Sequence, residues 1–468
     1  METEKKKHKL KLVVPHAYVI IGIILIFMTI LTYIIPAGQY DRVYDEALDQ
    51  EIIVPGSYHR VESSPVTPFK MVMALGNGMI DSADLIFFCF FAYGFVYILI
   101  KSGAFYGSVG WLQRLMGGKE SIMLFAFMVF FGICGSTCGI GEEFYGMVPA
   151  FIGIAIAMGY DGLVGGALVI VGTSIGFAAG TSNPFNVGIA QELAGLPIGS
   201  GMGFRIVCFI LFQGLATLFL MRYANRVKKN PELSAVKDVH FNVDTTMNGE
   251  TMAELPFTTR HKLIMLVFVG TIIMMVYGSI HLKWYLSELS ALFITAMFVA
   301  GFLAGFGPSK ICDLFIEATG EILFGAMVIG VARSLALVMQ DGNIIDSVVF
   351  YMSNVLKDVP QSLASIGMLF VQNIFNFFIP SATGQAAAVM PIMVDLADSI
   401  GMERQIAVLA YQFGDGFSNL FWPTAVATEC GIMGIPLQNW YKFIPPLFGM
   451  MFVLQIILMV VATMMGYH

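Results

Sequence analysis

Residues 176–186 read Gly-Phe-Ala-Ala-Gly-Thr-Ser-Asn-Pro-Phe-Asn and interrupt an uncharged run from Leu163 to Gln191. The run has the length and composition of a membrane-spanning helix. Its centre nevertheless carries glycine, polar side chains and Pro184, which lacks a backbone N–H and disfavours helix in the residue before it. Such a break survives at membrane depth only inside protein or beside a water-filled cavity, because lipid offers no hydrogen-bond partners.

A second break lies near the other end of the chain. Residues 413–423 read Phe-Gly-Asp-Gly-Phe-Ser-Asn-Leu-Phe-Trp-Pro, again with glycine, polar groups and a closing proline. Two broken helices in corresponding halves of a membrane protein are the best sequence indication of a transporter's binding site.

Composition places the whole chain in a membrane. Of the 468 residues 57% are hydrophobic and 12% are charged, whereas soluble domains are about one quarter charged. The net charge of −7 is concentrated in loops, and no basic face interleaved with aromatic residues suggests nucleic-acid binding. The six cysteines lie mostly in apolar runs, so we expect neither a disulfide framework nor a metal site.

The distribution of lysine and arginine predicts the orientation. The N-terminal tail and the stretch around residues 222–262 are basic, whereas residues 36–65 are mainly acidic. Because cytoplasmic loops carry an excess of positive charge, we expect a multi-pass protein of the inner (plasma) membrane with a cytoplasmic N-terminus. The apolar run 17–35 is long enough to span and is interpreted as an uncleaved first helix.

The chain divides into two similar halves. Residues 1–224 contain the first helix, a re-entrant hairpin near 121–158 and a broken helix over 163–196. Residues 225–261 form a hydrophilic cytoplasmic linker. Residues 262–468 repeat the pattern, with a hairpin near 361–400 and a broken helix over 404–433. Five crossings separate the two hairpins, and an odd number inverts one half. The expected fold is therefore an all-α polytopic membrane protein built from two inverted repeats.

The tips of the two hairpins, at residues 135–141 and 380–385, and the two breaks supply the candidate substrate- and ion-binding groups. Unwound carbonyls suit cations and half-helix N-termini suit anions. The alternative is that these small polar residues only allow helices to pack closely. The candidates are Ser136, Thr137, Glu142, Thr181, Ser182, Asn183, Asn186, Arg333, Ser381, Thr383, Gly384, Asp415, Ser418 and Asn419.

Charges inside apolar runs are costly and usually functional. Asp415 lies inside the second break, and Glu142 and Glu143 follow the first hairpin tip, where we expect only one of the pair to face the site. Arg333 either pairs with a carboxylate of the protein or holds a substrate carboxylate.

The other charged residues within or beside apolar runs are not among the main site candidates. We expect Glu192 and Arg205, which flank an outer loop, to contact water. Asp395, Asp398 and Arg404 are expected to form surface ion pairs. Glu429 is a further candidate within an apolar run.

Three segments resemble a known family. Residues 380–391 read Pro-Ser-Ala-Thr-Gly-Gln-Ala-Ala-Ala-Val-Met-Pro, and residues 405–419 read Gln-Ile-Ala-Val-Leu-Ala-Tyr-Gln-Phe-Gly-Asp-Gly-Phe-Ser-Asn. Together with residues 180–186 they resemble the C4-dicarboxylate anaerobic carrier family, in particular its YfcC-like branch. The resemblance implies an ion-transporter-superfamily fold: a homodimer with scaffold and transport domains and elevator-type movement. It also implies either basic amino acid exchange, the activity linked to that branch, or dicarboxylate transport.

We therefore expect a secondary active transporter of small amino acids, with arginine- or ornithine-type exchange or cation-coupled uptake as the leading hypothesis. The surplus of acidic residues near the breaks favours a substrate that carries a cation, or a cotransported cation. The coupling ion would be Na⁺ or H⁺, with Na⁺ candidate sites at residues 181–183 and 418–419, and no other cofactor is expected. The alternatives are a Na⁺- or H⁺-coupled C4-dicarboxylate carrier, an intramembrane enzyme, which the tail and loop positions of all seven histidines disfavour, and a channel.

Overall fold

The computed structural model describes residues 17–45, 50–116, 120–241, 255–282, 284–356 and 361–468. Its architecture is helical, as the composition predicts. Among the described residues seven helices are long and apolar enough to cross a membrane. They are α3 (Ala83–Lys101), α5 (Glu120–Cys138), α9 (Met202–Lys229), α11 (Thr259–His281), α12 (Leu286–Leu303), α13 (Pro308–Asp341) and α19 (Leu437–Met465).

Shorter helices complete each half. In the first half these are α1 (Ala17–Ile34), α2 (Pro68–Asp81), α4 (Ala104–Met116), η1 (Glu142–Met147), α6 (Val148–Ala157), α7 (Gly162–Ala178), η2 (Pro184–Gly188) and α8 (Ile189–Leu193). In the second half they are α14 (Ile345–Leu356), α15 (Gln361–Phe378), α16 (Ala382–Ser399), α17 (Arg404–Ser418) and α18 (Pro423–Met433).

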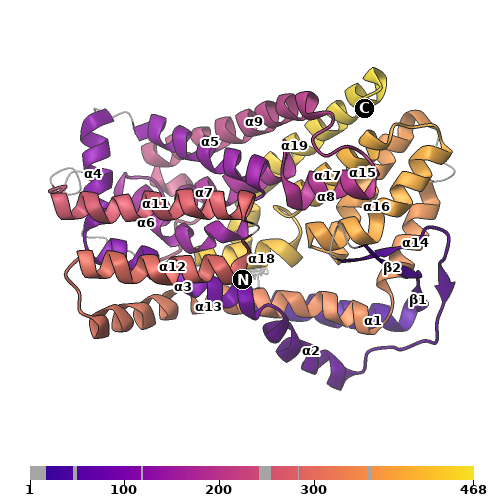
Figure 1. Cartoon of the computed structure of the whole chain (residues 1–468), viewed down its shortest axis with the longest axis horizontal. Helices are drawn as coiled ribbons and strands as arrows, with labels where there is room; N and C mark the ends of the chain where they lie inside the picture. The colour runs from indigo at the N-terminus through magenta and orange to yellow at the C-terminus, as the bar shows by residue number, and fades with distance from the viewer. Residues whose placement is uncertain (1–16, 46–49, 117–119, 242–254, 283, 357–360) are drawn as a thin grey trace, which may run out of the picture.

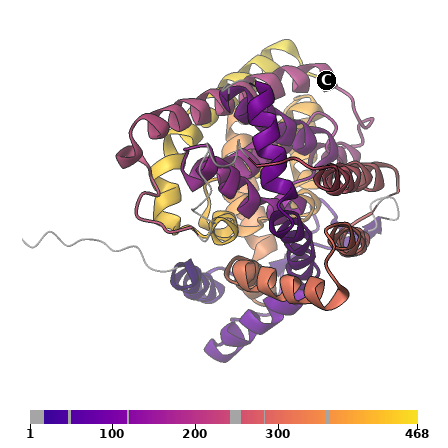
Figure 2. The ribbon, with the colours of Figure 1, turned by 90° about the vertical axis from the view of Figure 1, so that its left-hand side faces the viewer.

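One helical group surrounds the long helix α13. Helices α1, α2 and α3 pack against α13, and α12 packs against α3. The contact between α2 and α13 is close because Gly78 has no side chain, and a Cβ at that position would lie 2.3 Å from the carbonyl oxygen of Gly330. Figures 1 and 2 show α1 and α2 on the side of the molecule opposite α9 and α19.

A second helical group contains both breaks. Helix α7 packs against α5 and α6, and α17 packs against α15 and α16. Helices α7 and α17 also contact each other. The two broken helices therefore lie side by side, each held between the two helices of its own hairpin.

The segment between α1 and α2 contains short β-strands, which the all-α expectation missed. β1 (Gly38–Gln39) pairs antiparallel with β4 (His59–Arg60), and β2 (Arg42–Asp45) pairs antiparallel with β3 (Gln50–Ile53). They lie at one end of the molecule beside α14 (Figure 1). Hydropathy predicts membrane helices from long apolar runs, and hydrophilic strands as short as these leave no such signal.

The linker between the halves is shorter than predicted. Helix α9 continues to Lys229, past the boundary at residue 224, and its last turn carries Arg226, Lys228 and Lys229. Basic residues stabilise a helix C-terminus by opposing the helix dipole. After α9, a one-turn 3₁₀ helix, η3 (Pro231–Leu233), begins a segment that packs back onto the protein. Residues 242–254, the centre of the predicted linker, lie outside the described residues.

Candidate substrate and ion site

The first break is built around Asn183. Helix α7 ends at Ala178, and the short π-helix η2 begins at Pro184. The Asn183 side chain caps η2, because its Oδ1 accepts a hydrogen bond from the backbone N–H of Phe185 at 2.9 Å. Gly139 of the first hairpin tip approaches this cap in the left-handed region with φ 69°, and a Cβ there would lie 2.2 Å from Asn183 Oδ1. Only glycine fits this contact.

The first hairpin tip is hydrogen-bonded to the first break. The Ser136 carbonyl accepts from the backbone N–H groups of Thr181 and Ser182 at 2.9 and 3.2 Å. The Ser136 hydroxyl lies 3.2 Å from Thr181 Oγ1, and the Ser182 hydroxyl donates to the Thr137 carbonyl at 3.2 Å. These four predicted site residues therefore form one cluster.

The second break is held by a residue that sequence reasoning missed. Asn376, at the end of α15, donates from its side-chain amide to the Ser418 hydroxyl at 2.6 Å and to Asn419 Oδ1 at 2.7 Å. The same amide lies 2.9 Å from the Asp415 carbonyl. Asn376 is fully buried. In the sequence, only its position in the predicted hairpin, four residues before Pro380 at the tip, could have indicated that Asn376 reaches the second break.

Two hydrogen bonds join the breaks to each other. Asn186 of η2 donates from Nδ2 to Asp415 Oδ2 at 2.7 Å, and Gln412 of α17 donates from Nε2 to the Gly180 carbonyl at 2.8 Å. All three side chains are fully buried. Gln412 was also missed by sequence reasoning, although it lies one helical turn before Asp415 on the same face.

The junction between the breaks has more acceptors than donors. Asn186 Oδ1, Gln412 Oε1 and Asp415 Oδ1 are buried and have no hydrogen-bond partner within the described part of the chain. Buried polar atoms are normally paired, and an unpaired carboxylate oxygen is especially costly. Oxygen acceptors in surplus around a carboxylate can hold a proton, a small cation or a substrate ammonium group.

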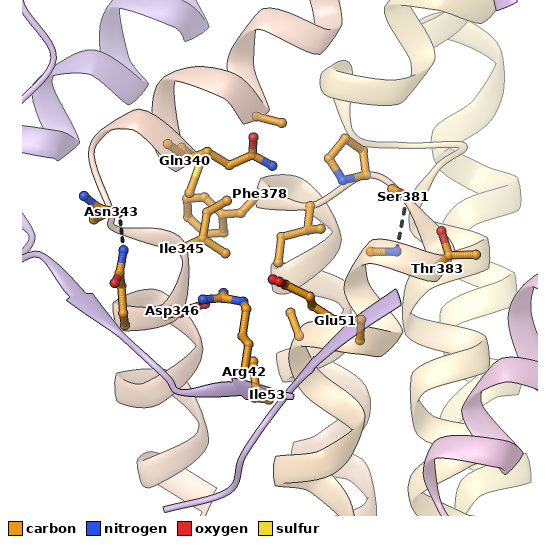
Figure 3. Close-up of a pocket in the computed structure, with 18 of the residues that line it drawn as sticks. Arg42, Glu51, Ile53, Gln340, Asn343, Ile345, Asp346, Phe378, Ser381 and Thr383 are labelled. Atoms are coloured by element: carbon orange, nitrogen blue, oxygen red, sulfur yellow. Dashed lines mark hydrogen bonds and ion pairs between the residues drawn. The ribbon is translucent and has the colours of Figure 1, made fainter. Parts of the chain in front are cut away.

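The second hairpin tip faces a cavity. Ser381, Thr383 and Gly384 line a cavity of about 540 Å³ together with Arg42 and Arg333. Figure 3 shows Ser381, Thr383 and Arg42 around this cavity. The Ser381 hydroxyl caps α16 by accepting from the Gly384 N–H at 3.4 Å. This tip joins α17 through Tyr411, whose hydroxyl donates to the Ala382 carbonyl at 2.6 Å. Within the described part of the chain, no hydrogen bond joins Ser381, Thr383 or Gly384 to Ser418 or Asn419, so the second tip forms a separate group.

Both arginines of this cavity have protein partners. Arg333 forms an ion pair with Asp81 of α2. Arg42 of β2 donates to both carboxylate oxygens of Asp346, at 2.9 Å to Oδ1 and 2.8 Å to Oδ2. Arg333 thus pairs with a carboxylate of the protein, the first of its two interpretations, and it also borders the cavity at the second tip.

The expected water contact of Arg205 is wrong. Its side chain is 1% exposed, and it donates to the Thr181 carbonyl at 3.3 Å and to the Tyr467 hydroxyl at 3.0 Å. Sequence position suggested an outer loop, but Arg205 lies in the first turn of α9, and its guanidinium turns toward Thr181 and Tyr467 instead of solvent. Arg205 thus places a buried guanidinium directly behind the first break.

The remaining charged candidates are less central. Arg404 donates to both Asp398 oxygens at 2.9 and 2.7 Å, as predicted, and these hydrogen bonds hold the pKa of Asp398 below its usual value. Glu192 is exposed, as expected. Asp395 is also exposed but forms no ion pair within the described part of the chain, so the expectation for it is wrong. Glu142 lies in η1 immediately after the first hairpin tip, close to Glu143 and Glu429.

A second cavity, of about 660 Å³, lies apart from the breaks. Its lining includes Tyr93, Lys101, His240, His261 and Glu321. Residues of α3, α4, α6, α11, α13 and α18 line it. The Tyr93 hydroxyl donates to Glu321 across part of this space at 2.5 Å.

Interrupted apolar helices that place polar groups at their junction define a multi-pass membrane protein with an internal polar site. A family model described as C4-dicarboxylate anaerobic carrier matches residues 14–464. The chain therefore belongs to this family and is a membrane transporter of that type, which confirms the family expected from the motifs.

Two curated relatives match over nearly their whole length. A protein of Escherichia coli (strain K12) that carries the provisional name basic amino acid antiporter YfcC is 28% identical over 97% of both chains. An uncharacterized protein of Haemophilus influenzae is 29% identical over 98% of this chain and 99% of its own.

Two solved transporters are more distant. The YdaH transporter of Alcanivorax borkumensis aligns over 97% of this chain and 99% of its own, with 13% identity and a TM-score of 0.44. MtrF of Neisseria gonorrhoeae, described in a class of antimetabolite efflux pumps, aligns over 97% and 96% with 15% identity and a TM-score of 0.43. Similarities this weak carry no argument about the function of this chain.

Proposed function

We propose that the protein is a secondary active transporter of a basic amino acid, acting by exchange or by cation-coupled uptake. The observation that carries the proposal is the hydrogen bond between Asn186 and Asp415, which joins the two breaks and leaves Asp415 Oδ1 without a partner among the described residues. A transported cation, or the ammonium group of a substrate, would supply the missing positive charge. The name of the Escherichia coli relative points in the same direction.

The proposal also covers the oligomeric state, the membrane, the movement and the coupling ion of the transporter. It acts as a homodimer in the inner (plasma) membrane with its N-terminus in the cytoplasm, moves its site by an elevator-type displacement, and uses no resident cofactor. Na⁺ or H⁺ is the coupling ion, held by the acceptors around Asp415 or at residues 181–183 and 418–419. It is a carrier and not an enzyme, since the polar groups of the breaks are suited to binding and release.

One observation favours a second candidate, a Na⁺- or H⁺-coupled C4-dicarboxylate carrier. Arg42 and Arg333 line the cavity at the second hairpin tip beside Ser381 and Thr383, and arginine forks suit carboxylates. Both arginines already pair with a carboxylate of the protein, which leaves less positive charge for a doubly charged anion. The family description agrees with this candidate.

Transport by the purified protein in proteoliposomes distinguishes the two candidates. Vesicles loaded with arginine or ornithine should accumulate labelled arginine from outside, and an excess of lysine or ornithine should compete whereas succinate should not. The counter-substrate and the Na⁺ and H⁺ gradients are varied one at a time to identify the coupling. Uptake of succinate without uptake of arginine or ornithine would replace the first proposal by the second.

A further inference from the structure

Three glutamates from two different elements lie close together beside the first hairpin tip. Glu142 and Glu143 belong to η1, and Glu429 belongs to α18, which follows the second break. Glu142 lies within electrostatic range of both Glu143 and Glu429. None of the three forms an ion pair with a described lysine or arginine, so three carboxyl groups meet here without a cation from that part of the protein.

The three glutamates differ in solvent exposure. Glu142 is exposed and Glu143 is half-buried, whereas Glu429 is only 4% exposed. Glu143 has a local role, because its Oε2 accepts the Gly141 N–H at 2.9 Å. Glu429 Oε2 is buried without a hydrogen-bond partner among the described residues, although Ser174 of α7 lies against its carboxylate. A cationic group beside Glu142 would therefore have an unpaired carboxylate oxygen of Glu429 within the same cluster.

Aromatic residues flank the carboxylates. Tyr145 of η1 lies within electrostatic range of both Glu142 and Glu429. Tyr285, at the start of α12, lies within electrostatic range of Glu142 and Glu143. The Tyr285 ring is 6.5 Å from that of Phe185, two residues after Asn183 of the first break. The acidic group is thus next to the break and not at a remote surface.

We infer that Glu142 and Glu429 form the subsite for the positively charged side chain of the substrate. This inference rests on the proposed function and names the residues that would recognise a basic amino acid. A guanidinium is planar, presents several donors and stacks on aromatic rings, which suits two carboxylates flanked by tyrosines. An alkylammonium group satisfies the same carboxylates with fewer directed hydrogen bonds.

Glu142 and Glu429 come from different halves of the chain, so a substrate bound between them would connect the two halves. Glu142 follows the first hairpin tip, and Glu429 follows the second break. A cation between them attracts two elements that otherwise repel each other electrostatically. Substrate binding should therefore hold η1 and α18 together, and the empty site should favour their separation.

Arginine and citrulline give a direct test because they differ mainly in the charge of the terminal group. Competition by each unlabelled compound against labelled arginine is measured with full-length protein in proteoliposomes. The wild type should prefer arginine over citrulline by at least about tenfold, the size expected for a charge-assisted hydrogen bond. Glu429→Gln and Glu142→Gln should each reduce that preference to less than about threefold, mainly by weakening arginine. Glu192→Gln, an exposed control, should keep the wild-type ratio.

The possible results distinguish a failure of the proposed subsite from a failure of the proposed transport function. Wild-type preference for arginine that persists in both Glu142→Gln and Glu429→Gln would overturn the subsite and leave the proposed function standing. A wild type that takes up neither arginine nor ornithine would overturn both. If Glu429→Gln does not yield folded protein, Glu142→Gln decides the question, because its side chain is exposed and the substitution keeps its shape.

Discussion

Asp415 and Asn186 each bring a fully buried polar side chain from a different half of the chain to the same point. Burying such groups in a membrane protein costs free energy, and the cost is greatest where an oxygen remains unpaired. A structural role alone would be served better by apolar side chains of similar size. The pair therefore fits the proposed substrate and ion site of the transporter.

Two substitutions separate charge from hydrogen bonding at this pair. Asp415→Asn keeps an oxygen that can accept the Asn186 amide, so we expect thermal stability close to wild type but transport reduced at least tenfold. Asn186→Ala removes the donor and should lower stability by about 1–3 kcal/mol, the cost of a buried acceptor without a partner. Thermal unfolding in detergent and arginine uptake measure the two effects. Wild-type uptake by Asp415→Asn would argue against a charged coupling or substrate site here.

Some of these residues could be predicted and others could not. Asn183 and Asp415 stand out because helix-breaking or charged residues are costly inside apolar runs and rarely serve packing alone. Asn376, in contrast, is one polar residue near a helix end, and only the fold shows that it reaches Ser418 and Asn419. Arg205 was misjudged because the sequence does not show that the first turn of α9 directs its side chain toward the first break and Tyr467.

At the scale of elements, close helix packing holds the breaks in place. Helix α7 lies against α5 at Gly135 and Gly176. A Cβ on Gly176 would lie 2.0 Å from the Gly132 carbonyl oxygen, and one on Gly135 would lie 2.3 Å from that of Thr173. Small residues that let backbones approach are typical of helix contacts in membranes. Close packing thus explains the glycines at these positions, and the site interpretation of the breaks stays a prediction.

Two glycine-to-alanine substitutions test this packing. Gly176→Ala should separate α7 from α5 and lower stability by about 1–3 kcal/mol, as overpacking does in well-packed cores. Gly214→Ala in α9 is the matched control, because a Cβ there meets no atom within 4 Å. It should be neutral or slightly stabilising, since alanine favours helix. Thermal unfolding of both variants is compared with wild type. Equal stability of the two variants would contradict the close contact between α5 and α7.

At the scale of the whole molecule, the two halves present their elements in the same order. An amphipathic helix, two hairpin helices, a broken helix and a long helix follow one another as α4 to α9 and again as α14 to α19. This order was visible in the sequence because each break and tip carries glycine, serine or proline. That the halves are inverted in the membrane stays a prediction from the count of crossings.

Labelling of cysteines from either side of the membrane tests the predicted orientation. Cys312, near the start of α13, is the exposed member of the six cysteines, so it serves as a natural probe. An impermeant maleimide should reach it from the cytoplasmic side. Val43→Cys, in β2 and 57% exposed, should react from the opposite side in a Cys312→Ser background. Labelling of both positions from the same side would contradict the topology.

An experimental structure of the protein in lipid nanodiscs with saturating arginine tests the central claim most directly. The account predicts ligand density enclosed by η2, α17 and the first hairpin tip, with the guanidinium directed to Glu142 and Glu429. Density confined to the cavity lined by Tyr93, Lys101 and His261, or breaks that stay empty while arginine is transported, would contradict it.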